Sequence, residues 1–346
     1  MNPNIWAIVP AHNEEKIIGQ TITDLLNQTT SISILVVADN CEDNTVRIVK
    51  KLMTINLNVF FIETVNNKNR KAGAVNQALE TLDDDVDAVL FMDADTRIHC
   101  KAVEKAWESL EKDPKLAAVC SKAGVISYEG KNPFRWFLHR LQRLEYSHFD
   151  SQRVETLNVI KVVHGMSSLH RFSALKEVGF YDENSFIEDY EITVRYRMAA
   201  WRVTVDLRMK AWTDVPTTFR DWWKQRTRWN RGSLQTLKKH GWNKATRGDI
   251  IQHFLVNILT LTQWFLIVAS ILMILNGSLL IHAIILIAII LSLADSIYRM
   301  SYLENPDAID FTMRVTIISE MLYGYLRVIN LHKTYFAALF KKDLTW

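Results

Sequence analysis

The sequence predicts an α/β fold with a mostly parallel sheet, followed by C-terminal transmembrane and interfacial helices. Over the first hundred residues, short apolar runs alternate with segments of helical spacing, as in strand-helix-strand units with right-handed crossovers. From Ile250 to Ala294, in contrast, the chain carries no Asp, Glu, Lys or Arg. With 346 residues and 49% apolar composition, it has room for two domains and a substantial core.

The predicted sheet places charged residues along one edge. Its strands are the runs IWAIVP, ISILVVAD, LNVFFIE and VDAVLFMDAD, and helical segments separate them. In such sheets, ligands bind beyond the carboxyl ends of the strands. Acids and bases together at this edge suit a nucleotide diphosphate with a metal ion, and the residues expected there are His12, Glu14, Asp39, Arg70, Lys71, Asp93 and Asp95.

The stretch VLFMDADT, which ends the fourth predicted strand, is compatible with two chemistries. In a haloacid-dehalogenase-type phosphatase, Asp93 would attack phosphorus and Asp95 would protonate the leaving group. In a nucleotide-sugar glycosyltransferase, the two carboxylates would hold a divalent cation against a diphosphate. An isolated D-x-D is also common in ordinary turns at strand ends, so the rest of the chain has to decide.

The surrounding sequence favours the transferase. Three strand-helix units precede the motif, whereas such phosphatases usually carry their nucleophile on an early strand. Downstream, Glu188 and Asp189 begin a predicted helix, where a carboxylate is stabilised by free N–H groups and can act as a base. In WWKQRTRWNRG, Gln225 and Arg228 suit phosphate oxygens and Trp229 suits a sugar face.

The uncharged run predicts two membrane spans, near 250–275 and 279–298, each about 20 residues long as a bilayer requires. Basic residues flank the pair, so the positive-inside rule predicts a multi-pass protein of the cell membrane with a cytoplasmic catalytic domain. The start of the chain has too few apolar residues for a signal peptide, and three unpatterned cysteines fit a reducing compartment. The predicted division is a catalytic domain at 1–235 and a membrane region at 250–346.

Three further segments are expected near the membrane surface. Those near 134–146 and 219–240 are both aromatic and basic, which predicts helices at the lipid headgroups. The segment 311–340 predicts a third span or an interfacial helix. Its predicted apolar face carries Ile317, Met321, Tyr325, Val328 and Leu331.

The ordered motifs resemble those of membrane glycosyltransferases of family 2, the group that contains cellulose, chitin, hyaluronan and poly-N-acetylglucosamine synthases. They are VPAHNEE, VVADNCEDNT, RKAGAVNQAL, MDADT, HGMSSLHR, IEDYEIT and QRTRW, and the resemblance covers about residues 5–235 and the membrane helices. It implies a GT-A fold and transfer with inversion from a UDP-sugar of the glucose or N-acetylglucosamine type.

The resemblance also implies roles for individual residues. Asp39 would bind the uracil or ribose end of the donor, helped by Ala11, His12 and Glu14, and Lys71 would belong to the same donor site. Asp93 and Asp95 would hold UDP and Mg2+ or Mn2+, and Asp189 would be the general base. Gln225 and Arg228 would contact the pyrophosphate. Gly165, Glu188 and Trp229 would shape the acceptor site, with His164 where the synthases often carry a smaller residue.

The expected partners are the donor, membrane lipid and either a polysaccharide or a lipid-linked acceptor, and no nucleic acid. Two or three helices are few for a polymer export channel. A polymerising enzyme would then assemble as a homo-oligomer. Alternatively, the helices would only bring the active site to a lipid-linked acceptor that receives a single sugar.

Overall fold

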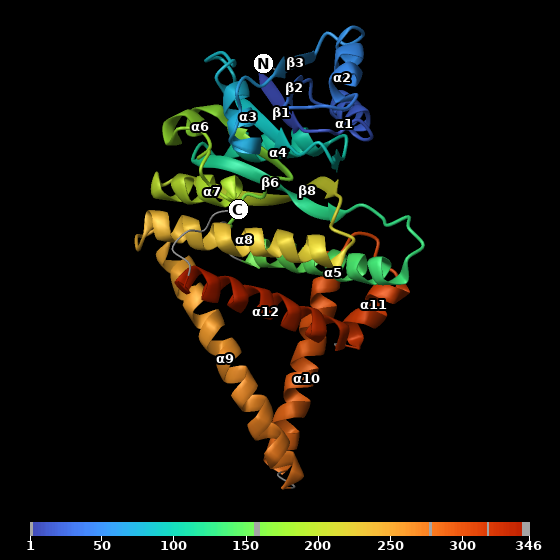
Figure 1. Ribbon diagram of the computed structural model, residues 1–346, viewed down its shortest axis with the longest axis vertical. Helices are drawn as coiled ribbons and strands as arrows, with labels where there is room; N and C mark the ends of the chain where they lie inside the picture. Colours follow the sequence, from blue (N-terminus) through green and yellow to red (C-terminus); the bar gives the residue numbers. More distant parts are fainter. Residues whose placement is uncertain (1–2, 156–159, 277–278, 317, 341–346) are drawn as a thin grey trace. The chain divides into compact units, whose positions relative to one another are not determined.

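The computed structural model describes residues 3–155, 160–276, 279–316 and 318–340. The chain divides into two compact units (Figure 1). We call them the sheet unit, which comprises Met1–Ser127 and Gln152–Val215, and the helical unit, which comprises Tyr128–Ser151 and Pro216–Trp346.

The first half of the sheet unit has the parallel strands that the alternating pattern predicts. β1 lies between β2 and β4, β3 lies outside β2, and all of these pairs are parallel. The elements are β1 (Ile5–Ala11), α1 (Ile18–Leu26), β2 (Ser33–Ala38), α2 (Thr45–Met53), β3 (Val59–Glu63), α3 (Arg70–Leu79) and β4 (Ala88–Met92).

The second half makes the sheet mixed rather than mostly parallel throughout. The strand order is β3-β2-β1-β4-β7-β6-β8-β5, in which β7 runs antiparallel to both of its neighbours and β5 runs antiparallel to β8. Among the described residues of this half, β6 and β8 form the one parallel pair. Its elements are β5 (Thr96–Ile98), α4 (Ala102–Lys112), β6 (Leu116–Val125), β7 (Ser167–Arg171), α6 (Phe172–Val178), α7 (Glu188–Met198) and β8 (Arg202–Thr213).

The core of the sheet unit fixes where the central strands end. All five residues of β4 are buried, and so are five of the six in β2, because both faces of these strands are covered. α3 packs small side chains, Ala74 and Ala78, into the same cluster as Phe91 of β4 and Ile192 of α7. The catalytic candidates therefore project from the ends of rigid elements.

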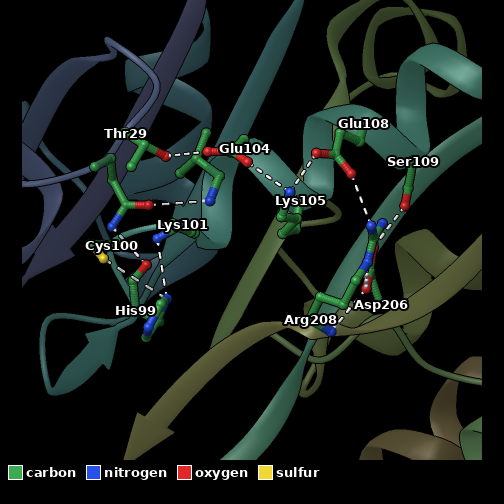
Figure 2. Close-up of polar contacts among 12 residues, drawn as sticks. Thr29, His99, Cys100, Lys101, Glu104, Lys105, Glu108, Ser109, Asp206 and Arg208 are labelled. Atoms are coloured by element: carbon green, nitrogen blue, oxygen red, sulfur yellow. Dashed lines mark hydrogen bonds and ion pairs between the residues drawn. The ribbon is translucent and has the colours of Figure 1, made fainter.

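Polar contacts add to the packing of α4 (Figure 2). The ammonium of Lys105 lies 2.7 Å from Glu104 and 2.5 Å from Glu108. Arg208 of β8 pairs with Glu108 at 2.9 Å and with Asp206 at 2.7 Å. Because most of these groups are solvent-accessible, each pair contributes little, and the buried apolar side of α4 holds the helix.

The helical unit packs four of its helices around a small apolar cluster. Leu141 and Leu144 of α5, Trp222 of α8, Met313 of α11 and Tyr323 of α12 form this cluster. The elements are α5 (Pro133–Glu155, whose last residues belong to the sheet unit), α8 (Phe219–His240), α9 (Arg247–Leu275), α10 (Leu279–Met300), α11 (Ala308–Val315) and α12 (Ile318–Phe340). The segments near 134–146 and 219–240 lie within the helices α5 and α8, and their position at the lipid headgroups stays a prediction.

Within the described residues, one helical stretch, His282–Met300, is long and apolar enough to cross a membrane. It covers most of the span predicted near 279–298. The segment predicted as a span near 250–275 is helical within α9, but several of its side chains lie outside the described residues, and its role as a span stays a prediction.

The segment 311–340 forms parts of two helices rather than one. Asp307 and Asp310 form a capping box that starts α11, and α12 follows from Ile318. α12 turns Tyr323, Asn330 and Thr334 inward, with at most 4% of each exposed, while Met321 of the predicted apolar face is 51% exposed. Ile317 lies outside the described residues.

Candidate active site

The loops after β1 and β2 meet at the carboxyl edge of the sheet. The N–H of Asp39 donates to the Ala11 carbonyl at 2.8 Å, and His12 Nδ1 donates to the Asp39 carbonyl at 2.6 Å. Asn13 and Asn40 have φ of 59° and 49°, a left-handed conformation that asparagine tolerates better than most residues. These turns bring Ala11, His12 and Asp39 together, as the strand pattern predicts.

The Asp39 carboxylate is oriented by three donors. Its Oδ1 accepts from Thr64 Oγ1 at 2.8 Å, from Asn67 Nδ2 at 2.9 Å and from Asn40 Nδ2 at 2.9 Å. Sequence reasoning did not select Thr64 or Asn67. The signal for them was available, because the polar run TVNNKN directly follows the third strand at the same edge.

Lys71 joins the two sides of the candidate site. Its ammonium lies 2.5 Å from Asp93 Oδ1 and 3.4 Å from Glu188 Oε1, and it donates to the Gly165 carbonyl at 3.2 Å. Burial alone would lower the pKa of Lys71, but the charges of Asp93 and Glu188 outweigh it and raise that pKa. Lys71 therefore stays protonated, between the D-x-D pair and the start of α7.

The carboxylates around Asp95 repel one another. Burial, followed by the charges of Asp93, Glu14 and Asp214, raises the pKa of Asp95 to about 7. Burial, Asp43 and Asp93 also raise the pKa of Glu14. Sequence reasoning missed Asp214, which directly follows β8. Among the described residues, no group of three or more His, Cys, Asp and Glu is already arranged for a metal ion.

Asp189 lies in the first turn of α7 and is held by backbone donors. Its Oδ2 accepts from the Gly165 N–H at 3.0 Å, and its Oδ1 accepts from the N–H of Tyr190 at 2.7 Å. Burial, then the adjacent Glu188, raise the pKa of Asp189 to about 6, against the opposing effect of Lys71. A Cβ on Gly165 would lie 3.0 Å from the Lys71 ammonium, so a glycine permits this close approach.

A small hollow in the sheet unit lies beside Asp189. Lys71, Gly165, Glu188 and Asp189 line it together with Phe91 and Tyr181. Beside it, His164 donates from Nε2 to the Ser121 carbonyl at 2.8 Å, and burial lowers its pKa to about 3, which keeps the ring neutral.

The loop before α7 is tied to α3 by residues that sequence reasoning did not select. Asn76 exchanges two hydrogen bonds with the backbone of Tyr181, at 2.9 and 3.0 Å. Glu183 accepts from Asn76 at 3.0 Å and from Asn69 at 2.5 Å. The helix that carries Lys71 is thereby linked to the loop that leads to Glu188 and Asp189. Both asparagines lie in or next to the motif RKAGAVNQAL, but the sequence did not indicate that they would contact residues 105 to 114 positions away.

The remaining three predicted residues belong to the helical unit. Gln225, Arg228 and Trp229 lie on α8 and are each half-buried. The amide oxygen of Gln225 accepts from Arg226, and the Trp229 ring lies 4.1 Å from the Arg226 guanidinium carbon.

Comparisons with known proteins agree with these motifs. The sequence profile of "Glycosyl transferase family 2" matches residues 6–179. Poly-β-1,6-N-acetyl-D-glucosamine synthase of Staphylococcus aureus (strain COL) is 27% identical over 237 residues, which is 67% of this chain and 55% of that protein. The Staphylococcus epidermidis synthase is 26% identical over 240 residues, 68% and 56% of the two chains. The chain thus matches about half the length of these curated relatives.

Solved structures share the fold. The mannosyltransferase PcManGT from Pyrobaculum calidifontis, solved with GDP-Man and Mn2+, aligns with a TM-score of 0.58 at 17% identity, covering 93% of this chain and 87% of that one. TarS of S. aureus aligns with a TM-score of 0.50 at 20% identity, covering 73% and 43%. The fold is GT-A-like, a mixed α/β sheet followed by C-terminal helices. With its family profile matched over half of its length, the chain belongs to glycosyltransferase family 2.

Proposed function

We propose that this protein transfers a sugar from a UDP-sugar to a growing polysaccharide, with inversion at the anomeric carbon. The observation that carries the proposal is the placement of Lys71 between Asp93, on the expected donor side, and Glu188 beside Asp189, on the expected acceptor side. The family match sets aside the phosphatase interpretation of the D-x-D pair.

Asp189 is the proposed general base. An acceptor hydroxyl is a weak nucleophile near neutral pH, and a carboxylate within hydrogen-bond reach can remove its proton as the new bond forms. A pKa of about 6 leaves Asp189 mostly ionised at pH 7 while making it more basic than an ordinary aspartate. Glu188, Gly165 and Trp229 are the proposed acceptor contacts.

The proposed donor-binding residues come from the loops after β1 and β2, from α3 and from α8. Asp39, already fixed by three donors, would bind the uracil or ribose end beside Ala11, His12 and Glu14. The Lys71 ammonium, and the Gln225 amide and Arg228 guanidinium of α8, would offer donors to pyrophosphate oxygens. Such contacts accelerate transfer when they strengthen as the diphosphate charge develops.

Asp93 and Asp95 fit a divalent cation by the chemistry of their donors. Carboxylate oxygens are the ligands that Mg2+ and Mn2+ prefer. Burial, followed by the charges of Asp93, Glu14 and Asp214, raises the pKa of Asp95 to about 7, and a cation would relieve this accumulated negative charge. A bound Mg2+ or Mn2+ would supply positive charge next to the leaving diphosphate.

The relatives support N-acetylglucosamine as the sugar and a polymer as the product, since the S. aureus and S. epidermidis proteins are named as poly-β-1,6-N-acetyl-D-glucosamine synthases. Single-sugar transfer to a lipid-linked acceptor is the alternative. A polymerising enzyme would assemble as a homo-oligomer in the membrane.

The experiment is UDP release by the detergent-purified protein with Mg2+ or Mn2+ across a panel of UDP-sugars, followed by gel analysis. We expect UDP-N-acetylglucosamine to be turned over into long chains. One added sugar on a lipid would establish the alternative. Absence of turnover with every donor would refute the proposal.

A further inference from the structure

A buried polar cluster joins three helices of the helical unit. Glu145 of α5, Arg226 of α8 and Tyr323 of α12 are each at most 5% exposed. One carboxylate oxygen, Glu145 Oε2, accepts from Arg226 and, at 2.6 Å, from the Tyr323 hydroxyl. Trp222 in turn donates to the Tyr323 oxygen at 2.7 Å.

The cluster keeps an ionised carboxylate away from water. Burial by itself would raise the pKa of Glu145, but Arg226 and Arg327 outweigh it and bring that pKa below its ordinary value. Arg327 lies 3.3 Å from the second carboxylate oxygen. Apolar residues of similar volume often stabilise a fold as well as a buried ion pair does, so stability alone explains this cluster poorly.

The other side of Arg226 contacts two residues of the QRTRW motif. One of its terminal nitrogens donates to the Gln225 amide oxygen, and its guanidinium carbon lies 4.1 Å from the centre of the Trp229 ring. Because the amide oxygen of Gln225 accepts this hydrogen bond, the orientation of the amide is fixed and its N–H groups can donate to phosphate oxygens. The stacked guanidinium also restrains the Trp229 ring, a common arrangement for arginine.

We propose that Glu145 and Tyr323 are positioning residues for α8. They hold Arg226, and Arg226 orients the Gln225 amide and the Trp229 ring for a diphosphate and a sugar. The inference rests on the proposed function for the identity of those two ligands, while the orienting contacts stand by themselves.

The first test compares Glu145→Gln with a matched control, Asp310→Asn. Asp310 is fully buried, and its carboxylate pairs with Arg140 of α5 at 2.8 Å. Asp310→Asn therefore also removes the charge of a buried carboxylate that is paired with α5. The contacts of Asp310 do not involve Gln225, Arg226 or Trp229, which makes it a matched control. We expect Glu145→Gln to lower kcat/KM for the UDP-sugar by roughly 100-fold, the scale of a small misplacement of binding groups. Asp310→Asn should keep kcat/KM near the wild-type value, even if its midpoint of thermal denaturation falls as far as that of Glu145→Gln. Equal losses of kcat/KM in both variants would overturn the proposal.

The second test does not depend on activity. The full-length protein is labelled with fluorotryptophan, and the Trp229 signal is assigned by its absence in Trp229→Phe. The 19F resonance of Trp229 should shift or broaden in Glu145→Gln and in Tyr323→Phe, and stay in place in Asp310→Asn. An unchanged resonance in Glu145→Gln overturns the positioning role. A wild-type protein that turns over no donor would instead refute the proposed function, and the 19F result would still decide the inference.

Discussion

At the scale of single residues, the chemistry of Asp189 depends on its neighbours. Burial, followed by the charge of Glu188, raises the pKa of Asp189, whereas Lys71 and the N–H groups of Gly165 and Tyr190 stabilise its charge. The balance leaves a pKa of about 6, between an ordinary aspartate and a histidine. A residue that only capped α7 would not require this combination of partners.

Asp189→Asn should reduce sugar transfer by about 10²–10⁴-fold, the usual contribution of a general base. UDP affinity, measured by calorimetry on the same preparation, should not change, because the expected nucleotide contacts lie elsewhere. A parallel loss of UDP binding would contradict the role as base.

The pH dependence should follow the same residue. Because the base must be ionised, kcat/KM should fall as the pH drops below about 6. Glu188→Gln removes a like charge, so it should move this acidic limb to lower pH. If the acidic limb of the pH profile stays in place or moves to higher pH in Glu188→Gln, the limb reports the ionisation of a group other than Asp189.

Asp95 should control metal binding in a different pH range. Its raised pKa means that a proton competes with the cation below about pH 7. Mn2+ binding, followed by electron paramagnetic resonance, should therefore weaken steadily from pH 8 to pH 6. Asp95→Asn should bind Mn2+ poorly throughout, and affinity independent of pH in the wild type would count against this site.

At the scale of elements, the approach of the chain to α7 is set by a turn and by α3. Gly179 ends α6 with φ of 83°, and Phe180 follows with φ of 53°. Asn76 then holds the next residue, Tyr181, through both of its backbone hydrogen bonds. The first turn of α7, and with it Asp189, is thus positioned by contacts far away in the sequence.

Gly179→Ala should lower the free energy of unfolding by about 1–2 kcal/mol, because a Cβ is strained in the left-handed conformation. Gly19→Ala is the matched control: it lies in α1 with an ordinary helical backbone, and its Cβ would meet only Ile48, at 3.7 Å. Gly19→Ala should raise the free energy of unfolding by about 0.5–1 kcal/mol. Thermal denaturation in detergent, followed by circular dichroism, measures the stability of both variants. Equal midpoints for the two variants would contradict the left-handed conformation of Gly179.

At the scale of the whole molecule, membrane attachment is expected to depend on α10. His282–Met300 has the length and composition of a span, and Ile287 within it is 57% exposed. A charge at the centre of a span costs about 2.5–3.5 kcal/mol on insertion scales.

Ile287→Arg should therefore release part of the protein from membranes during carbonate extraction, whereas Ile287→Leu should stay in the membrane pellet. The measurement is the fraction of full-length protein in the supernatant, by immunoblot. If both variants remain in the pellet to the same extent as wild type, α10 does not determine attachment.

The sequence by itself determined the family and the parallel first half of the sheet. These follow from local periodicity and from short motifs, which report backbone conformation and solvent exposure within a few residues. It also located α10, because bilayer thickness sets the length of an apolar run.

Only the tertiary structure decided which groups meet. The antiparallel course of β7, the Lys71 contacts to Asp93 and Glu188, and the inward side of α12 all depend on contacts between distant residues. Trp222 and Arg226, four residues apart, share one buried side of α8, but the sequence could not show that Glu145 and Tyr323 receive them. Burial and neighbouring charge set the pKa values of Asp95 and Asp189 as well, and both arise only when the chain has packed.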